Sequence, residues 1–182
     1  SKKSNKTLNE GKVFNIAFCA TITTQKNPIL FNEIALFFEN DPQVKFTWIG
    51  GGELKHLLTS SNITITDWRT KKEVYKNLKQ SDLYLSTSEW EGLSLSTIEA
   101  LAFGLPLVLS NCLGNIDIIK SADYGFLFDT KEKAIDSINI LRKNKELYAN
   151  MSINSLENYN KNYNNHRCGL KYKELYNSLV NP

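Results

Sequence analysis

Cysteine and histidine are scarce in this chain, which has three cysteines and two histidines among 182 residues. Cys19, Cys112 and Cys168 are odd in number and widely spaced, and no C-x-x-C pair or Cys/His cluster occurs. This pattern excludes a disulfide framework and the usual zinc-binding spacings. We interpret the isolated His56 and His166 as packing or surface residues. The sequence therefore predicts no metal site and favours a reducing compartment.

Long apolar runs and a strong excess of charge are also missing. No apolar run approaches the roughly 20 residues that a membrane-spanning helix requires, and we expect no signal peptide. With 22 basic and 19 acidic residues, the net charge of +3 is too small to indicate a nucleic-acid partner. It suits an anionic nucleotide or a peripheral contact with acidic lipid. We therefore expect a cytoplasmic protein, with peripheral binding at the inner face of the cell membrane as an alternative.

The chain does contain a regular alternation of short apolar strands with helical segments of about ten residues. Residues 1–12 are polar and lack periodicity, which predicts a linker or an expression remnant and leaves 13–182 as one domain. Strands are expected at 13–19, 44–49, 63–66, 83–85, 107–109 and 125–128. Three helices are expected after the last strand, at 134–142, 145–159 and 166–179. The pattern predicts an α/β fold, in which a Rossmann-like six-stranded parallel sheet carries helices on both faces and is followed by C-terminal helices.

In such a sheet, ligands bind beyond the carboxyl ends of the strands, where the strand order reverses. Four turns that are far apart in the sequence, at 20–27, 50–52, 67–69 and 89–95, should therefore lie along one edge of the sheet. We expect the binding site at this edge.

One of these turns connects a strand to a helix. Residues 83–85 form the expected strand, and an apolar helical pattern begins near Leu95. Backbone N–H groups in the first turn of a helix have no intrahelical partner and lie at the positive end of the helix dipole. The amides of Leu93, Ser94 and Leu95 are therefore expected to bind an anion such as a phosphate.

The segment EGLSLSTIEALAFGLPLVLSN, from Glu91 to Asn111, resembles the signature of the retaining GT-B glycosyltransferases of the family 4 type. The positions that match are Glu91, Gly92, Glu99, Ala100, Ala102, Gly104 and Pro106. The resemblance covers about residues 14–179. It implies an enzyme of two Rossmann-like halves with the active site between them. This chain looks like the C-terminal half, which holds the nucleotide-sugar donor, and the acceptor-binding N-terminal half is expected to be absent.

The resemblance also implies roles for the two glutamates. Glu99 is expected to bind the ribose hydroxyls, and the alternative is a capping box in which it bonds only to the N–H of Ser96. Glu91 is expected to contact the donor sugar or to stabilise the transition state, and the alternative is an exposed turn carboxylate. Gly92, beside Glu91, is expected to contact the substrate.

The loop TITTQKNP is similar to the phosphate loop of this family, and Lys26 matches the lysine that neutralises the diphosphate. Thr21 stands where an arginine is usual, and Ala20 replaces the usual glycine. One positive charge that would contact the leaving phosphate is therefore missing. Electrostatic stabilisation of this kind is typically the largest catalytic term. Arg69 or a basic residue of the absent half supplies it, or the activity is weak, or the donor is unusual. For Arg69 itself, the simpler interpretation is a surface arginine.

Two further turns are expected to contribute to the donor site. Gly51 is expected to contact substrate through the turn after the second strand. Asp67 and Trp68 are candidates to flank the base, although a tryptophan at a strand end more often packs against the core. Neither turn carries a family signature of its own.

The resemblance thus implies the donor-binding half of a retaining glycosyltransferase. Its donor would be a UDP-, GDP- or similar nucleotide-activated sugar, and a hexose-type sugar would pass to a glycan or lipid-linked acceptor held by the absent half. We expect no cofactor, no metal and no turnover by this half alone. Two alternatives stay open, namely a nucleotide-sugar epimerase-like GT-B protein and a non-catalytic domain that binds nucleotide-sugars.

Overall fold

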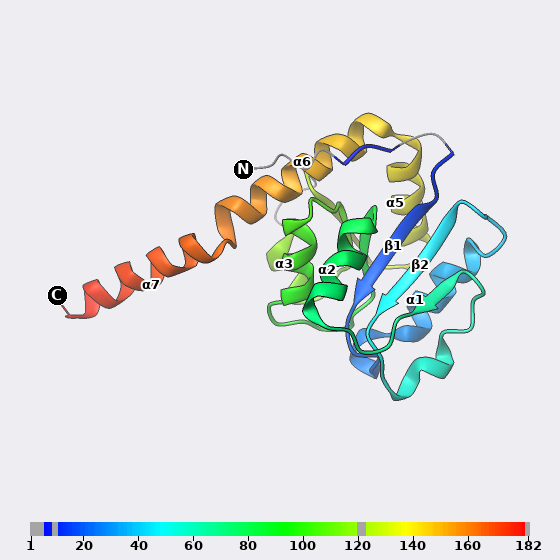
Figure 1. Ribbon diagram of the computed structural model, residues 1–182, viewed down its shortest axis with the longest axis horizontal. Coiled ribbons are helices and arrows are strands. Elements are labelled where there is room, and N and C mark those ends of the chain that lie inside the picture. Colours follow the sequence, from blue (N-terminus) through cyan, green and yellow to red (C-terminus); the bar gives the residue numbers. More distant parts are fainter. Residues whose placement is uncertain (1–5, 9–10, 120–122, 181–182) are drawn as a thin grey trace.

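A computed structural model describes residues 6–8, 11–119 and 123–180 (Figure 1). Six parallel strands form one sheet in the order β3-β2-β1-β4-β5-β6. Their bounds are β1 Phe14–Cys19, β2 Val44–Ile49, β3 Ile63–Ile65, β4 Leu83–Ser86, β5 Leu107–Ser110 and β6 Gly125–Phe128. This is the strand order of a doubly wound Rossmann-like sheet. The predicted fold class is confirmed.

Helices cover both faces of the sheet. Their bounds are α1 Pro28–Phe37, α2 Lys71–Gln80, α3 Leu95–Ala102, α4 Asn115–Ile118, α5 Lys131–Lys143, α6 Lys145–Asn162 and α7 Asn165–Val180, with 3-10 turns η1 Thr24–Lys26 and η2 Glu53–Leu57. Figure 1 shows α2 and α3 side by side in front of the sheet, whereas α1 packs against α5 behind it. The helix α7 extends away from the rest of the domain.

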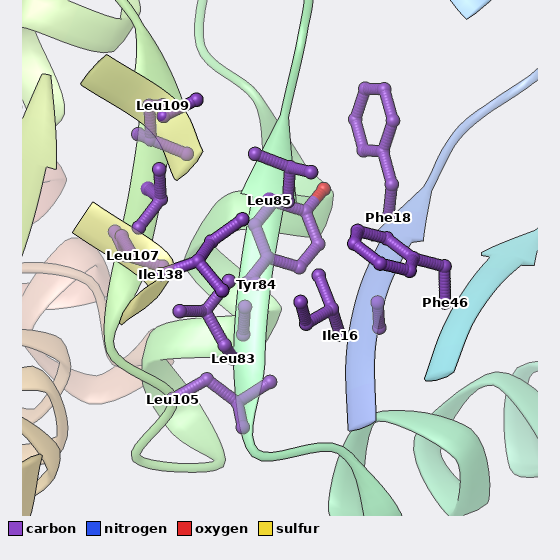
Figure 2. Packing of buried hydrophobic residues seen from close by; sticks show 14 of the residues in the cluster. Ile16, Phe18, Phe46, Leu83, Tyr84, Leu85, Leu105, Leu107, Leu109 and Ile138 are labelled. Carbon is purple, nitrogen blue, oxygen red and sulfur yellow. The ribbon is translucent and has the colours of Figure 1, made fainter. Parts of the chain in front are cut away.

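The sheet is buried on both faces, and this explains why its strands are apolar runs. Figure 2 shows Ile16, Phe18, Tyr84 and Leu85 packed together across the neighbouring strands β1 and β4. Phe18 lies on Trp48 of β2 with ring centroids 4.7 Å apart, and both side chains are almost completely buried. The core therefore holds the middle of the sheet rigid, and the loops at its edges are free to carry other chemistry.

Several predicted helix ends are wrong, because side-chain caps decide them. The helix expected to begin at residue 134 begins at Lys131, where the Thr130 side chain accepts a bond from Lys133 N. Likewise, α6 runs past Tyr159 to Asn162, since Tyr159 still packs against the core. A side-chain cap also begins α1, where Asn27 accepts from Leu30 N and Pro28 lies in the first turn.

The segment expected to be a linker has contacts in its described part. Leu8 packs partly against the core, and Lys12 Nζ lies 2.9 Å from Asp82 Oδ1 at the amino end of β4. Residues 11–12 therefore lie against the edge of the sheet opposite the expected site.

Candidate functional site

The strand order reverses between β1 and β4, and the loops that leave these two strands are bonded to each other. Glu89 N donates to Gln25 O at 2.8 Å, and Gln25 Nε2 donates to Trp90 O at 2.9 Å. Thr87 Oγ1 donates to Lys26 O at 2.8 Å. The predicted phosphate loop and the first part of the glutamate motif therefore form one wall at the carboxyl edge.

Within this wall, Lys26 and Glu91 form an ion pair. Lys26 Nζ lies 2.5 Å from Glu91 Oε1, and the two side chains are 17% and 7% exposed. Ser88 Oγ donates to the same carboxylate oxygen at 2.7 Å. The alternative of Glu91 as an exposed turn carboxylate is therefore wrong. The sequence had placed both residues at the site, but not in contact with each other.

Gly114, which the sequence analysis did not single out, packs against the backbone of the turn at Glu91 and Gly92. Gly114 has φ +87°, and a Cβ there would lie 2.2 Å from Gly92 O and 2.5 Å from Glu91 O. Glu91 N also donates to Leu113 O at 3.1 Å. At Gly92 itself, a Cβ would meet open space. The steric need for glycine is therefore at Gly114, one loop away from the motif.

The helix α3 begins as predicted, but a different residue caps it. Ser94 is the N-cap and its side chain accepts from Thr97 N at 3.4 Å. Ser96 Oγ instead accepts from Tyr84 Oη at 2.8 Å. The capping box of Ser96 and Glu99 is therefore not formed. The exposed side chains of Leu93 and Leu95 flank the N-terminus of the helix.

Glu99 turns toward α2. Tyr75 Oη donates to Glu99 Oε1 at 3.1 Å, and Lys71 Nζ lies 5.4 Å from the centre of the Tyr75 ring. Contact with Tyr75 and then the charge of Glu99 raise the pKa of Lys71. At the end of β1, burial and then the nearby Glu99 carboxylate raise the pKa of the Cys19 thiol to about 11. Glu99 thus holds a partly buried charge beside the loop that follows β1.

An open groove of about 800 Å³ runs along the ends of β1, β2 and β3. Its lining residues are Thr21, Ile22, Thr23, Thr24, Gly52, Glu53, Leu54, Lys55, Asp67 and Trp68. Gly51 lies behind it, where Gly51 O accepts from Ile22 N at 2.9 Å. Trp68 is 69% exposed, so the interpretation of Trp68 as a packing residue is wrong.

Two basic residues, Lys55 and Arg69, lie in or next to the segments that line this groove. Arg69 Nη1 lies 3.7 Å from Glu73 Oε1, one helical turn away, and both side chains are nearly half exposed. Lys55 lines the groove with Thr21, and Lys55 Nζ lies 3.5 Å from Asp67 Oδ1. Lys55 is therefore better placed than Arg69 to add charge beside Thr21, and no motif in the sequence pointed to it.

The remaining residues add no metal site in the described part of the chain, where no group of three His, Cys, Asp or Glu side chains could hold an ion. Among the same residues, no helix is long and apolar enough to cross a membrane. His56 is exposed as expected. The side chains of His166 and Cys168 lie outside what the structure describes.

Comparisons with known proteins identify the family of this chain. The family described as glycosyl transferases group 1 matches residues 1–158. The Escherichia coli UDP-Gal:alpha-D-GlcNAc-diphosphoundecaprenol alpha-1,3-galactosyltransferase is 34% identical over 171 residues, which are 86% of this chain and 43% of that protein. Spore coat protein SA of Bacillus subtilis is 27% identical over 72% of this chain and 40% of its own length. The chain thus spans less than half of these relatives.

Solved structures with the same fold include enzymes crystallised with UDP. A mutant of TarM from S. aureus, in complex with Fondaparinux, alpha-GlcNAc-glycerol and UDP, superposes with a TM-score of 0.79 at 26% identity. The match covers 94% of this chain and 38% of TarM. HepE of Anabaena in complex with UDP has a TM-score of 0.80 over 92% of this chain and 49% of HepE. At 15% identity, HepE supports the fold alone.

Proposed function

Since this chain belongs to the group 1 glycosyltransferases, we propose that it is the donor-binding half of a retaining glycosyltransferase of the family 4 type. The donor is a nucleotide-activated sugar, and a hexose-type sugar passes to a glycan or lipid-linked acceptor. The single observation that carries this proposal is the ion pair of Lys26 and Glu91 beyond the ends of β1 and β4, where open α/β sheets bind their ligands.

In this proposal, each residue at the carboxyl edge has a defined task. Lys26 neutralises the diphosphate and helps it to leave, and the amides at the start of α3 bind its oxygens. Glu91 contacts the donor sugar through the carboxylate oxygen that is not bonded to Lys26. Glu99 binds the ribose hydroxyls, because a carboxylate accepts bonds from two neighbouring O–H groups at once.

The groove beside Thr21 takes the base end of the nucleotide. Trp68 offers a large exposed ring there, and Gly51 leaves room beside it, since a Cβ at Gly51 would lie 3.1 Å from Asp67 Oδ1 and 3.4 Å from Trp68 Nε1. We propose UDP in preference to GDP, because the Escherichia coli relative is named for a UDP-sugar and TarM was solved with UDP.

Residues 13–182 form the donor domain in this proposal, residues 1–12 lead into it, and a separate N-terminal half binds the acceptor. The length of the relatives supports the second half, since this chain spans 43% of the Escherichia coli enzyme. Exposed apolar side chains beside Glu91, namely Trp90, Leu93 and Leu113, offer a surface for it. A lipid-linked acceptor would also account for a cytoplasmic enzyme at the inner face of the membrane.

A non-catalytic nucleotide-sugar-binding domain is the second candidate. The observation that favours it is Thr21, which leaves Lys26 without the usual arginine beside the diphosphate. Transfer or donor hydrolysis by the complete two-domain protein would reject this candidate. The isolated chain is expected to be inactive in either case, since orientation between two walls supplies roughly 7–11 kcal/mol of a barrier.

Calorimetry of this chain with UDP, GDP, ADP and CMP tests the proposal directly. We expect UDP to bind without added metal, and Glu99→Gln to weaken binding by ~1.5–3 kcal/mol, the value of a hydrogen bond to a charged group. Glu157→Gln, an exposed change on α6, serves as the matched control and should leave affinity unchanged. Absence of heat with every nucleotide, or equal affinities of the Glu99 variant and wild type, would reject the assignment.

A further inference from the structure

Glu91 uses its two carboxylate oxygens unequally. Oε1 accepts from both Lys26 Nζ, at 2.5 Å, and Ser88 Oγ, at 2.7 Å. In the described part of the chain, no hydrogen bond is found to Oε2. One oxygen is therefore held from two sides, and the other is left to meet a ligand.

If the proposed function holds, Lys26 interacts with two anions, the Glu91 carboxylate and the diphosphate of the donor. Its side chain is already paired with Glu91 and is only 17% exposed. An entering diphosphate would compete for the same ammonium group, because Thr21 brings no charge of its own. The ammonium group has three N–H donors and can bond both anions, but its single positive charge is then shared between Glu91 and the diphosphate.

Ser88 is placed to hold Glu91 through this exchange. It is completely buried at the end of β4, and Ser86 Oγ donates to Ser88 Oγ at 3.2 Å. Ser110 Oγ of β5 donates to Ser88 O, and Asn115 Nδ2 donates to Ser110 Oγ at 3.2 Å. Ser88 is therefore held to β4 through its hydroxyl and to β5 through its backbone carbonyl, and its neutral hydroxyl is attracted to a phosphate less strongly than the Lys26 ammonium is.

We propose that Ser88 is a positioning residue that keeps the Glu91 carboxylate aimed at the donor sugar when the diphosphate draws Lys26 away. The inference rests on the proposed function. Two tasks are thereby separated at the Glu91 carboxylate. Lys26 balances the charge of Glu91 before the donor binds, and Ser88 fixes the position of Glu91 once the donor is bound.

The test compares UDP with UDP-sugars on this chain by calorimetry, using UDP-galactose and UDP-N-acetylglucosamine as probes. Wild type should bind at least one UDP-sugar more tightly than UDP. Ser88→Ala should reduce that preference about fivefold to tenfold, in line with the net contribution of one typical hydrogen bond, and leave the affinity for UDP itself within twofold. In the Glu91→Ala background, the same substitution should have no effect on the preference.

Ser152→Ala is the matched control for lost stability. Ser152 lies on α6, away from the site, and is also completely buried. Its hydroxyl donates to Gly104 O at 2.7 Å. It should unfold at a similarly lowered denaturant concentration but keep the preference for the UDP-sugar.

The outcomes separate this inference from the proposed function. If UDP fails to bind wild type, the proposed function and the inference fall together. If UDP binds through Lys26 but wild type shows no preference for either UDP-sugar, or Ser88→Ala behaves like Ser152→Ala, only the inference is overturned. The same holds if Ser88→Ala acts equally with and without Glu91.

Discussion

The two ends of the strand pair β1 and β4 each carry a lysine paired with an acid, and the pairs differ in what they leave free. At the amino end, Lys12 bonds Asp82 Oδ1 at 2.9 Å while Asn15 N donates to Asp82 Oδ2, also at 2.9 Å. Both oxygens of Asp82 are therefore occupied. At the carboxyl end, one oxygen of Glu91 accepts both bonds.

The exposure of the two lysines differs in the same sense. Lys12 is 47% exposed and Lys26 only 17% exposed, although both acids are nearly buried. A buried lysine held by one oxygen is costly to keep, since removing a charge from water is repaid only by good partners. The amino end is thus arranged for stability, and the carboxyl end keeps charge and a free acceptor for a ligand.

The largest effect expected from this comparison is on stability. Asp82→Ala leaves the backbone N–H of Asn15 unpaired and removes the acceptor for Lys12, and should lower the free energy of unfolding by about 2–3 kcal/mol. Glu91→Ala should cost only about 1 kcal/mol, because the long side chain of Lys26 can turn to water at the open edge of the sheet once the acid is gone. Urea unfolding of the two variants measures the difference. Equal losses would break the distinction between a structural and a functional end.

The sequence was sufficient to predict the fold because apolar runs and helical periods are local signals. All six strands fall where they were expected, and the motif around Glu91 indicated a glycosyltransferase, which the match to the group 1 family confirms. Helix ends were less predictable, since caps such as Thr130 compete with apolar periodicity to set them.

The site was predicted only in part, because its pairings join segments that are far apart in the chain. The rule for parallel sheets placed the turns of Lys26 and Glu91 on one edge, and the family resemblance assigned Glu99 to the site. Neither could indicate that Lys26 would bond Glu91, that Tyr75 would bond Glu99, or that Gly114 would support the turn. Each of these contacts depends on how two loops approach each other, and no local pattern encodes that distance.

High pH offers a second way to sharpen the comparison, with a smaller effect. Burial and then Glu99 raise the pKa of Cys19 from 9.0 to about 11 in the folded protein. Between these values the unfolded chain loses the thiol proton first, so stability should fall as the pH rises through this window. We expect a loss of about 1–2 kcal/mol from this group.

Unfolding of wild type and Cys19→Ser at pH 7, 9 and 11 measures that loss. The two proteins should differ by a constant amount between pH 7 and 9, and wild type should then lose more stability by pH 11. Parallel curves over the whole range would mean that the thiol does not sense the carboxyl edge.

The smallest effect concerns Thr21, where the carboxyl end lacks the charge that its family usually has. Thr21→Arg should tighten the binding of UDP by about 0.5–1 kcal/mol, because the new contact is Coulombic and partly exposed. Uridine should gain nothing, and the gain for UDP should shrink as salt is raised. Thr24→Arg, in the same groove, is the control for charge added without position.

The origin of any compensating charge can be read from a double-mutant cycle. Lys55 lines the groove with Thr21, whereas Arg69 pairs with Glu73 on α2. If Lys55 substitutes for the missing arginine, Thr21→Arg should gain more in the Lys55→Met background than in wild type, and the same gain in the Arg69→Ala background as in wild type. Additive effects with both residues would leave Lys26 as the cation that binds the diphosphate among the described residues of this edge. Equal gains for uridine and UDP would instead reject the loop after β1 as the phosphate loop, and with it the reason why Lys26 must be shared with Glu91.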